Sequence, residues 1–389
     1  MRKLLTCHAK GGVSKMHVFI DESGSFSGFH AESISVVGAL AVPDAKLDLL
    51  QKKYAKIRAR LPLEKGEVKG RSLSETQINE VVTLLARNEV LLESTAIDLG
   101  MHTEQAVLAY KKQHGEEMLA KVPNFREDVR PEVEKASREI LKTSVPLYLQ
   151  ALTTFEVLHR LIGHTTMYFS QRRSSELGAF AWIVDGKDPL TVTKWEEWWS
   201  HYAQGALATM SNRRPSPRLS SGDYSFYERS FGMTNENGET GTSLKLLLKD
   251  IRFSAKSDAG LEFVDILSNA IRRALTGNLQ KDGWKNIRRL MVHRNETYLQ
   301  FILLGEGQDI IQKASYAKVV DEGFSSHGKS MLTPNNSRLV AKEIAESGLS
   351  AQAVQIPAPS IVVIATPTCI VLGRDQLRYF FGAENWVVH

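Results

Sequence analysis

The amino-acid sequence predicts an α/β protein in which strands and helices alternate along the chain. Short apolar runs of strand length, such as 33–42, are followed by segments with apolar residues at helical spacing, such as 74–85. The 389 residues are 42% hydrophobic and 24% charged, which is typical of a globular protein long enough to bury a sizeable core.

The first half of the chain predicts strands, helices and then a long helical segment. Three apolar runs are expected strands: 16–21, 33–42 and 90–99. Asp44 is expected to cap a basic amphipathic helix that runs to about Leu61, and Ser74 to open the next helix. The part from about 101 to 175 is helical in pattern, and its last helix, 145–169, has apolar residues at core spacing. We interpret this part as a helical insertion between strands.

The second half predicts further strands and helices around a loop-rich segment at 212–243. The expected strands are 178–184, 244–253, 296–304 and an apolar run near Ile361; the expected helices are 191–211, 258–275 and about 337–346. We therefore divide the chain into a leader expected to be disordered (1–15), a main domain (16–305) and a C-terminal extension (306–389).

Charge and cysteine content narrow the class of protein. A net charge of +5 is small for a chain of 389 residues, so it favours a polyanionic partner only weakly. Cys7 and Cys369 are too few for a disulfide framework or a zinc cage, which favours a cytoplasmic protein. The apolar stretch 361–372 is short and interrupted by Pro367, and the N-terminus lacks the apolar region of a signal peptide, so no membrane partner is expected.

Acidic residues stand at the ends of several predicted elements. Asp21 and Glu22 end the first strand, Asp185 ends the strand 178–184, and Asp265 lies in the apolar stripe of the helix that Asp258 opens. Converging carboxylates are the ligands that Mg²⁺ or Mn²⁺ requires, and two such ions can clamp a phosphodiester. Each acid also has a structural explanation. Asp258 would serve as an N-cap, and Asp265 would form a salt bridge with a residue such as Arg272.

These motifs resemble the bacterial domain-of-unknown-function family 3800. Its members open with a strand that ends in Asp-Glu-Ser-Gly, as at 21–24 here, and close the core with a helix similar to 260–266. The segment 67–70 is similar to the family's Glu-x-Lys element, and Asp185 fits its middle acid. The resemblance spans about 16–305 and implies a ribonuclease H-like mixed five-stranded sheet flanked by helices, with the first-strand and last-helix aspartates in the active centre.

The chain departs from the family pattern at two positions. Glu262 stands where glutamine is usual, which adds a possible metal ligand, and Val264 replaces a small alanine, which would crowd the site.

Three other patterns have competing interpretations. The segment 323–330 matches the P-loop pattern but lacks a preceding strand, and Pro334 would break the helix that should follow. We therefore expect a basic loop near the metal centre, whose Lys329 or His327 touches a phosphate. The tryptophans at 195, 198 and 199 form either a core contact or a stacking platform for bases. Basic residues after the Asp265 helix form either a solvated face or a track for the phosphate backbone; with Lys329, the candidates are Arg272, Arg273, Lys285, Arg288 and Arg289.

The sequence hypothesis is a nuclease or related phosphodiesterase that depends on Mg²⁺ or Mn²⁺ and cleaves RNA or DNA. Asp21 would bridge two ions, Asp185 and Asp265 would each hold one, and an activated water would attack the phosphorus. Glu22, Asp258 or Glu262 would complete the site, and Lys69 would balance charge or contact substrate. The alternative is a degenerate centre in a protein that binds nucleic acid or a partner within a bacterial defence or mobile-element system. A protein partner or homo-oligomer remains open.

Overall fold

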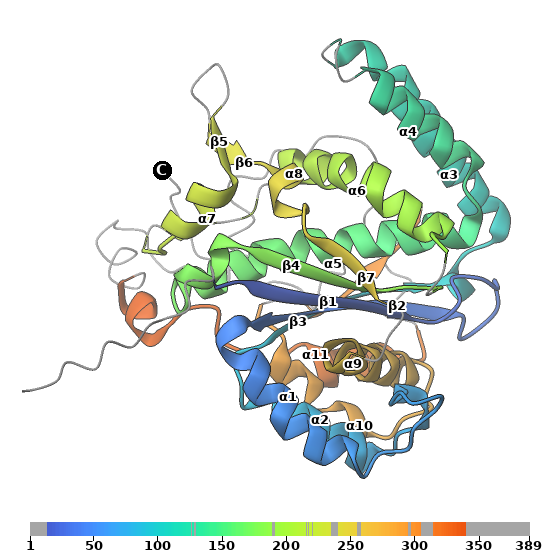
Figure 1. The fold of residues 1–389 in the computed structure, drawn as a ribbon. Helices are drawn as coiled ribbons and strands as arrows, with labels where there is room; N and C mark the ends of the chain where they lie inside the picture. The colour runs from blue at the N-terminus through green and yellow to red at the C-terminus, as the bar shows by residue number, and fades with distance from the viewer. Residues whose placement is uncertain are drawn as a thin grey trace, which may run out of the picture.

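A six-stranded mixed sheet forms the centre of the protein in a computed structural model (Figure 1). The structure describes residues 14–339 except 126, 128–129, 189–190, 215, 217, 220, 235–239, 255–257, 295–296 and 305–313. The expected leader up to residue 13, the strand near Ile361 and most of the helix 337–346 therefore lie outside the described residues. Within those residues, no helix is long and apolar enough to cross a bilayer.

Five strands of the sheet run in one direction and β2 runs against them. The order is β7-β4-β1-β2-β3-β8, with β1 at Met16–Ser23, β2 at Ile34–Pro43, β3 at Leu91–Asp98, β4 at Phe180–Asp185, β7 at Ile251–Ser254 and β8 at Leu299–Ile302. β2 pairs antiparallel with β1 and β3, whereas β1–β4, β4–β7 and β3–β8 are parallel pairs. The C-terminal ends of β1, β3, β4, β7 and β8 therefore meet at one edge of the sheet.

One face of the sheet is covered by α9 and a group of shorter helices (Figure 1). This layer contains α1 (Asp44–Arg58), α2 (Glu75–Ala86), α9 (Ala259–Leu275), α10 (Lys281–Trp284), α11 (Ala317–Phe324) and the 3₁₀ turns η1 (Gly70–Ser72) and η5 (Ile287–Leu290). Phe19, Leu40 and Val264 meet in its core. Ser74 caps α2 with a capping box, as expected, whereas Asp44 is the first residue of α1 and contacts His17.

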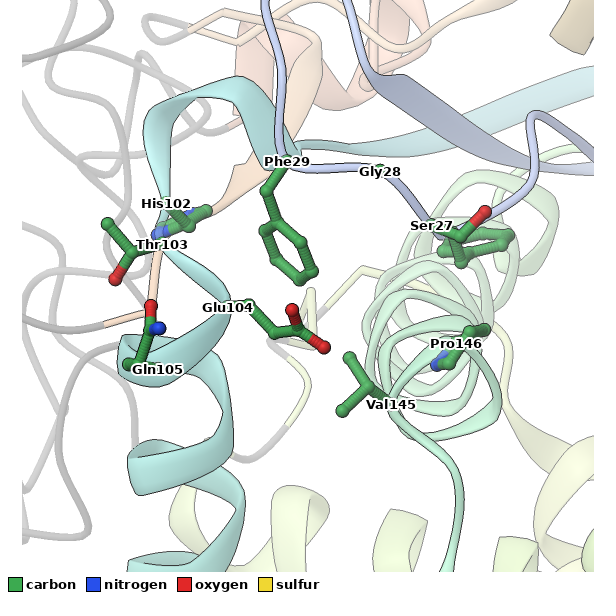
Figure 2. A pocket seen from close by; sticks show the side chains of 10 residues that line it. Ser27, Gly28, Phe29, His102, Thr103, Glu104, Gln105, Val145 and Pro146 are labelled. Carbon is green, nitrogen blue, oxygen red and sulfur yellow. The ribbon is translucent and has the colours of Figure 1, made fainter.

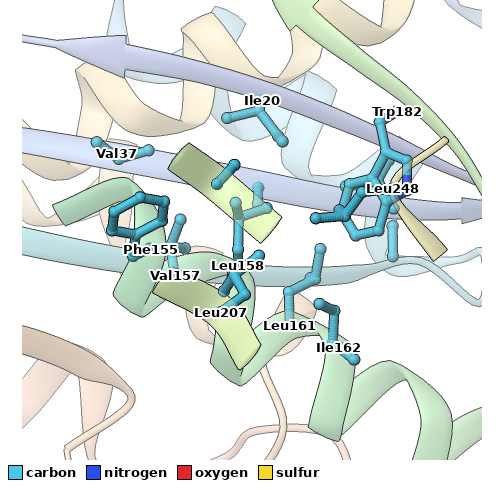
Figure 3. Close-up of a cluster of buried hydrophobic side chains, with 14 of the residues drawn as sticks. Ile20, Val37, Phe155, Val157, Leu158, Leu161, Ile162, Trp182, Leu207 and Leu248 are labelled. Atoms are coloured by element: carbon cyan, nitrogen blue, oxygen red, sulfur yellow. The ribbon is translucent and has the colours of Figure 1, made fainter. Parts of the chain in front are cut away.

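The opposite face is covered by α5, whose apolar side packs on β2 and β3. Figure 3 shows Phe155, Leu158 and Leu161 of this helix near Ile20 and Val37 of the sheet. This layer contains α5 (Val145–Ser170), α6 (Lys194–Arg213), α7 (Ser225–Phe231), α8 (Leu244–Leu247) and η4 (Ser174–Gly178). Apart from it, α3 (Glu104–Ala120) and α4 (Arg130–Lys142) pair as a hairpin that extends from the sheet (Figure 1). The small remaining elements are η2 (Leu99–Met101), η3 (Val122–Asn124), β5 (Gly232–Thr234) and β6 (Thr240–Thr242).

Two expectations need correction. The sheet has six strands rather than the five that the resemblance implies, because the segment expected at 296–304 pairs with β3 as β8. The expected strand 244–253 is divided into α8, which Ser243 caps, and β7. Within the segment interpreted as a helical insertion, α5 is a core helix that packs on the sheet. In the described part of the expected extension, Tyr316 stacks on Phe301 and donates a hydrogen bond to Asp98.

A buried ionic cluster lies between β3 and α5. Glu93 is 1% exposed and accepts hydrogen bonds from Arg294 (3.1 Å) and His164 (2.5 Å), and Arg160 lies 3.4 Å away. Burial alone would raise the pKa of Glu93, but Arg294 and the other cationic partners lower it well below the usual range. Glu93 is therefore ionised and joins β3, an inner strand of the sheet, to α5.

Candidate metal centre

Asp21, Asp185 and Asp265 converge where β1 and β4 end beneath α9. In β1, Phe19, Asp21 and Ser23 share the face toward α9, and Asn269 of α9 donates a hydrogen bond to Ser23 (3.2 Å). Val184 of β4 pairs with Ile20, so Asp185 follows at the level of Asp21 on the neighbouring strand. Both Asp185 and Asp265 are close enough to raise the pKa of Asp21, so the structure groups the three acids that the sequence analysis selected.

The position of α9 is set by its cap and by a close approach to β2. Asp258 is the N-cap and accepts a hydrogen bond from the backbone N–H of Gly260 (2.8 Å). Gly38 lies opposite Asp21 on β2, and a Cβ there would lie 3.2 Å from Val264 Cγ2. Because Gly38 has no side chain, α9 packs on the sheet directly beside Asp21.

Asp265 is held by the turn η1 rather than by the salt bridge considered above. Its Oδ2 accepts a hydrogen bond from the backbone N–H of Gly70 (2.7 Å), whereas Arg272 donates to the carbonyl of Ile34 (2.9 Å). The loop before η1 also brings Glu67 and Lys69, which form an ion pair at 2.6 Å, toward the carboxylates. Glu67 is a fourth acid of this group that the sequence analysis noted without assigning it a role.

Lys187 is the second residue that sequence reasoning missed. Its ammonium contacts the carboxylate of Glu22 and lies 3.9 Å from Asp185 Oδ2. Burial lowers the pKa of Lys187, while Asp21 acts in the opposite direction. Its spacing of two residues from Asp185 was an available signal, because alternate residues of an extended segment point the same way.

The pKa shifts describe an acidic group that burial and repulsion make costly to ionise. Burial, followed by repulsion from Asp185 and Asp265, raises the pKa of Asp21 well above its usual value, and Lys187 and Lys69 oppose this. Burial raises the pKa of Asp185 to about 6, and burial also raises that of Asp265. Burial acts to lower the pKa of Lys69. The hydrogen bond with Glu67 and the negative charge of Asp265 outweigh this effect, so the pKa of Lys69 is raised.

Glu262 and Asp258 are occupied elsewhere. The carboxylate of Glu262 accepts hydrogen bonds from Tyr54 (2.8 Å), Arg58 (2.8 Å) and the backbone N–H of Val68 (3.1 Å). It therefore joins α9 to α1 and to the loop before η1. Asp258 acts as the N-cap of α9.

Most of the predicted nucleic-acid contacts are engaged within the protein. Arg272 binds Ile34 as described, Arg273 donates to the carbonyls of Gly70 (3.2 Å) and Leu73 (2.8 Å), and Arg288 donates to that of Glu322 (2.8 Å). Lys285 pairs with Asp282, and Arg289 is exposed. The contacts of Arg272, Arg273 and Arg288 help to hold α9, η1 and α11 in place, and a phosphate-binding role of this group stays a prediction.

The P-loop match and the tryptophans also have structural roles. Gly323 lies in the last turn of a helix, α11, rather than after a strand, and the ammonium of the half-buried Lys329 donates to the carbonyl of Asn88 (3.2 Å). Burial lowers the pKa of Lys329 to about 8. Trp195 and Trp198 are buried and stack at 5.2 Å between ring centroids, which confirms the core interpretation.

A pocket of about 590 Å³ opens at the same edge of the sheet, on the side of α5. Its lining comes from the loop after β1, the start of α3 and the start of α5. Figure 2 shows Glu104 pointing into it between Phe29 and Val145, with His102 on the α3 side. The pocket is distinct from the acidic group, which faces α9.

The acidic group fits Mg²⁺ or Mn²⁺ by its donor chemistry. Asp21, Asp185 and Asp265 supply carboxylate oxygens, and their mutual repulsion is the field that a divalent cation relieves. Within the described residues, however, no three His, Cys, Asp or Glu side chains are grouped closely enough to share an ion. The carboxylates are neighbours that are compensated by lysines in this conformation.

Comparisons of the chain with protein-family models, with curated proteins and with solved structures found no match.

Proposed function

We propose that the protein is a nuclease or phosphodiesterase that depends on Mg²⁺ or Mn²⁺, built on a ribonuclease H-like sheet. The observation that carries this proposal is the convergence of Asp21, Asp185 and Asp265 from two adjacent strands and a helix. Strands and helices hold carboxylates more rigidly than loops do, which suits a site that must fix ions in place. The mixed sheet, with its first strand at the centre, agrees with the resemblance to the bacterial family.

When bound, the ions would polarise the phosphate and promote ionisation of the attacking water. Asp21, the most buried of the three acids, would be shared between ions, and Asp185 and Asp265 would hold one each. The hydrogen bond from Gly70 keeps one oxygen of Asp265 oriented. Lys69 is 36% exposed beside the acids, so its ammonium is positioned to meet a substrate phosphate. The substrate class is nucleic acid, either RNA or DNA.

The test is cleavage of end-labelled single-stranded, duplex and hybrid nucleic acids in Mg²⁺, Mn²⁺ or EDTA. We expect wild-type cleavage that needs the metal, and at least about a hundredfold loss in Asp21→Asn and Asp265→Asn. Asp282→Asn is the matched control, because Asp282 is 78% exposed and pairs with Lys285 on α10. Equal cleavage by Asp21→Asn and wild type would refute the assignment. Retained binding without cleavage under every condition would favour the nucleic-acid-binding alternative.

A further inference from the structure

The Lys187 ammonium lies within the acidic group, at a place where a cation is required. It contacts Glu22 and lies 3.9 Å from Asp185 Oδ2, and its charge acts to lower the pKa of Asp21. A buried group of like charges is stable only when it is compensated by a counter-ion or by protonation. The side chain is 36% exposed, so it retains a route toward solvent.

We propose that Lys187 is the internal counter-ion of this centre and that a divalent cation displaces it on binding. This inference rests on the proposed function, because it concerns the same carboxylates. Without the ion, the lysine offsets the repulsion among Asp21, Asp185 and Glu22. When an ion takes over this charge, the ammonium of Lys187 moves to the solvent-facing side of Glu22.

Within the described residues, the acids of this group are not drawn together to ligand distance. Carboxylates that repel one another approach closely only around a common cation, and a single ammonium draws together fewer oxygens than a divalent ion does. Lys187 contacts Glu22 and approaches Asp185, while Asp265 is turned toward Gly70. The centre is therefore arranged for a lysine in this conformation, and metal binding must compete with that arrangement.

The experiment measures Mn²⁺ affinity by calorimetry and by electron paramagnetic resonance at fixed pH. The variants are Lys187→Met, which keeps the length but removes the charge, and Lys187→Arg, which keeps the charge. Because a positive charge about 4 Å from a ligand carboxylate opposes a cation strongly, we expect Lys187→Met to bind about tenfold more tightly or better. Lys187→Arg should bind no more tightly than wild type. Lys112→Met is the control, because Lys112 is 71% exposed on α3.

The outcomes separate this inference from the nuclease proposal. Wild-type binding that is unchanged or weakened in Lys187→Met overturns the displacement and leaves the proposed metal centre standing. Binding by Lys187→Met alone overturns the displacement, because the ion then does not displace the lysine in the wild type, and it leaves the carboxylates standing as a metal site. Absence of binding in wild type and in both variants, each with a cooperative unfolding transition, overturns the displacement together with the metal centre.

Discussion

Replacing Gly70 with alanine tests how closely η1 must approach α9. A Cβ at this position would lie 2.8 Å from Ile266 Cα and 3.0 Å from the carbonyl oxygen of Asp265, both of which are backbone atoms that cannot rotate away. The backbone of Gly70 is not left-handed, so alanine adds no conformational strain of its own. The unfavourable part of the effect is therefore the lack of space for the methyl group.

The magnitude follows from the separation that the new methyl group needs. To reach an ordinary contact of about 3.4 Å, η1 must withdraw by about 0.6 Å, which stretches the 2.7 Å hydrogen bond from Gly70 to Asp265 beyond 3 Å. Overpacking costs about 1–3 kcal/mol, and weakening a hydrogen bond to a charged group adds to it, so we expect a loss of about 2–4 kcal/mol. Asp265 also loses its orientation, so metal-dependent cleavage should fall.

Urea unfolding in metal-free buffer measures this loss. The matched control is Gly205→Ala, because Gly205 lies exposed within α6 with no atom within 4 Å of the new Cβ. Alanine there should stabilise the protein by about 0.5–1 kcal/mol through its higher helix propensity. A free energy of unfolding for Gly70→Ala within about 0.5 kcal/mol of wild type would refute the close approach described here.

Two further predictions concern ionised groups. The pKa of Asp185 is about 6 in the folded protein, against an ordinary value of 3.8, so ionisation of this carboxyl disfavours folding. The metal-free protein should therefore lose stability as the pH rises from about 4 to about 6. Asp185→Asn should flatten this part of the plot of urea midpoint against pH. An unchanged slope in that variant would contradict the shift. Glu93→Gln leaves Arg294 and Arg160 without their counter-charge and should lower the free energy of unfolding by about 3–5 kcal/mol, measured by heat or urea. The Mn²⁺ affinity should stay at the wild-type value. A loss below about 1 kcal/mol would show that the cluster does not stabilise the fold.

Local signals in the sequence were sufficient for the elements that surround the candidate centre. The apolar run before Asp21 and the cap at Asp258 predicted β1 and α9, because these features act within a few residues of each other. The run 244–253 was wrongly assigned as one strand, since its leucines suit a helix equally well and Ser243 caps the first turn. Residue propensity cannot distinguish a helix from a strand here, because the packing of this segment against α6 determines which of them forms.

Contacts between distant segments were not visible in the sequence. Glu262 was considered a possible metal ligand because it stands where the family pattern has glutamine, yet Tyr54 and Arg58 of α1 bind its carboxylate. The spacing of Lys187 from Asp185 was visible in the sequence, but its contact with Glu22 exists only because β4 lies beside β1. Charge patterns within one segment identify candidate acids, but their counter-ions depend on strand order.

The long separation along the chain between Asp21 and Asp265 has a consequence for protein synthesis. The strand that carries Asp21 leaves the ribosome early, whereas α9 follows only after more than half of the chain has been made. Contacts between such distant segments form late, because the chain must first close a long loop. A nascent or prematurely terminated polypeptide thus has an incomplete set of acids. The set of acids is therefore complete only after α9 has docked on the sheet.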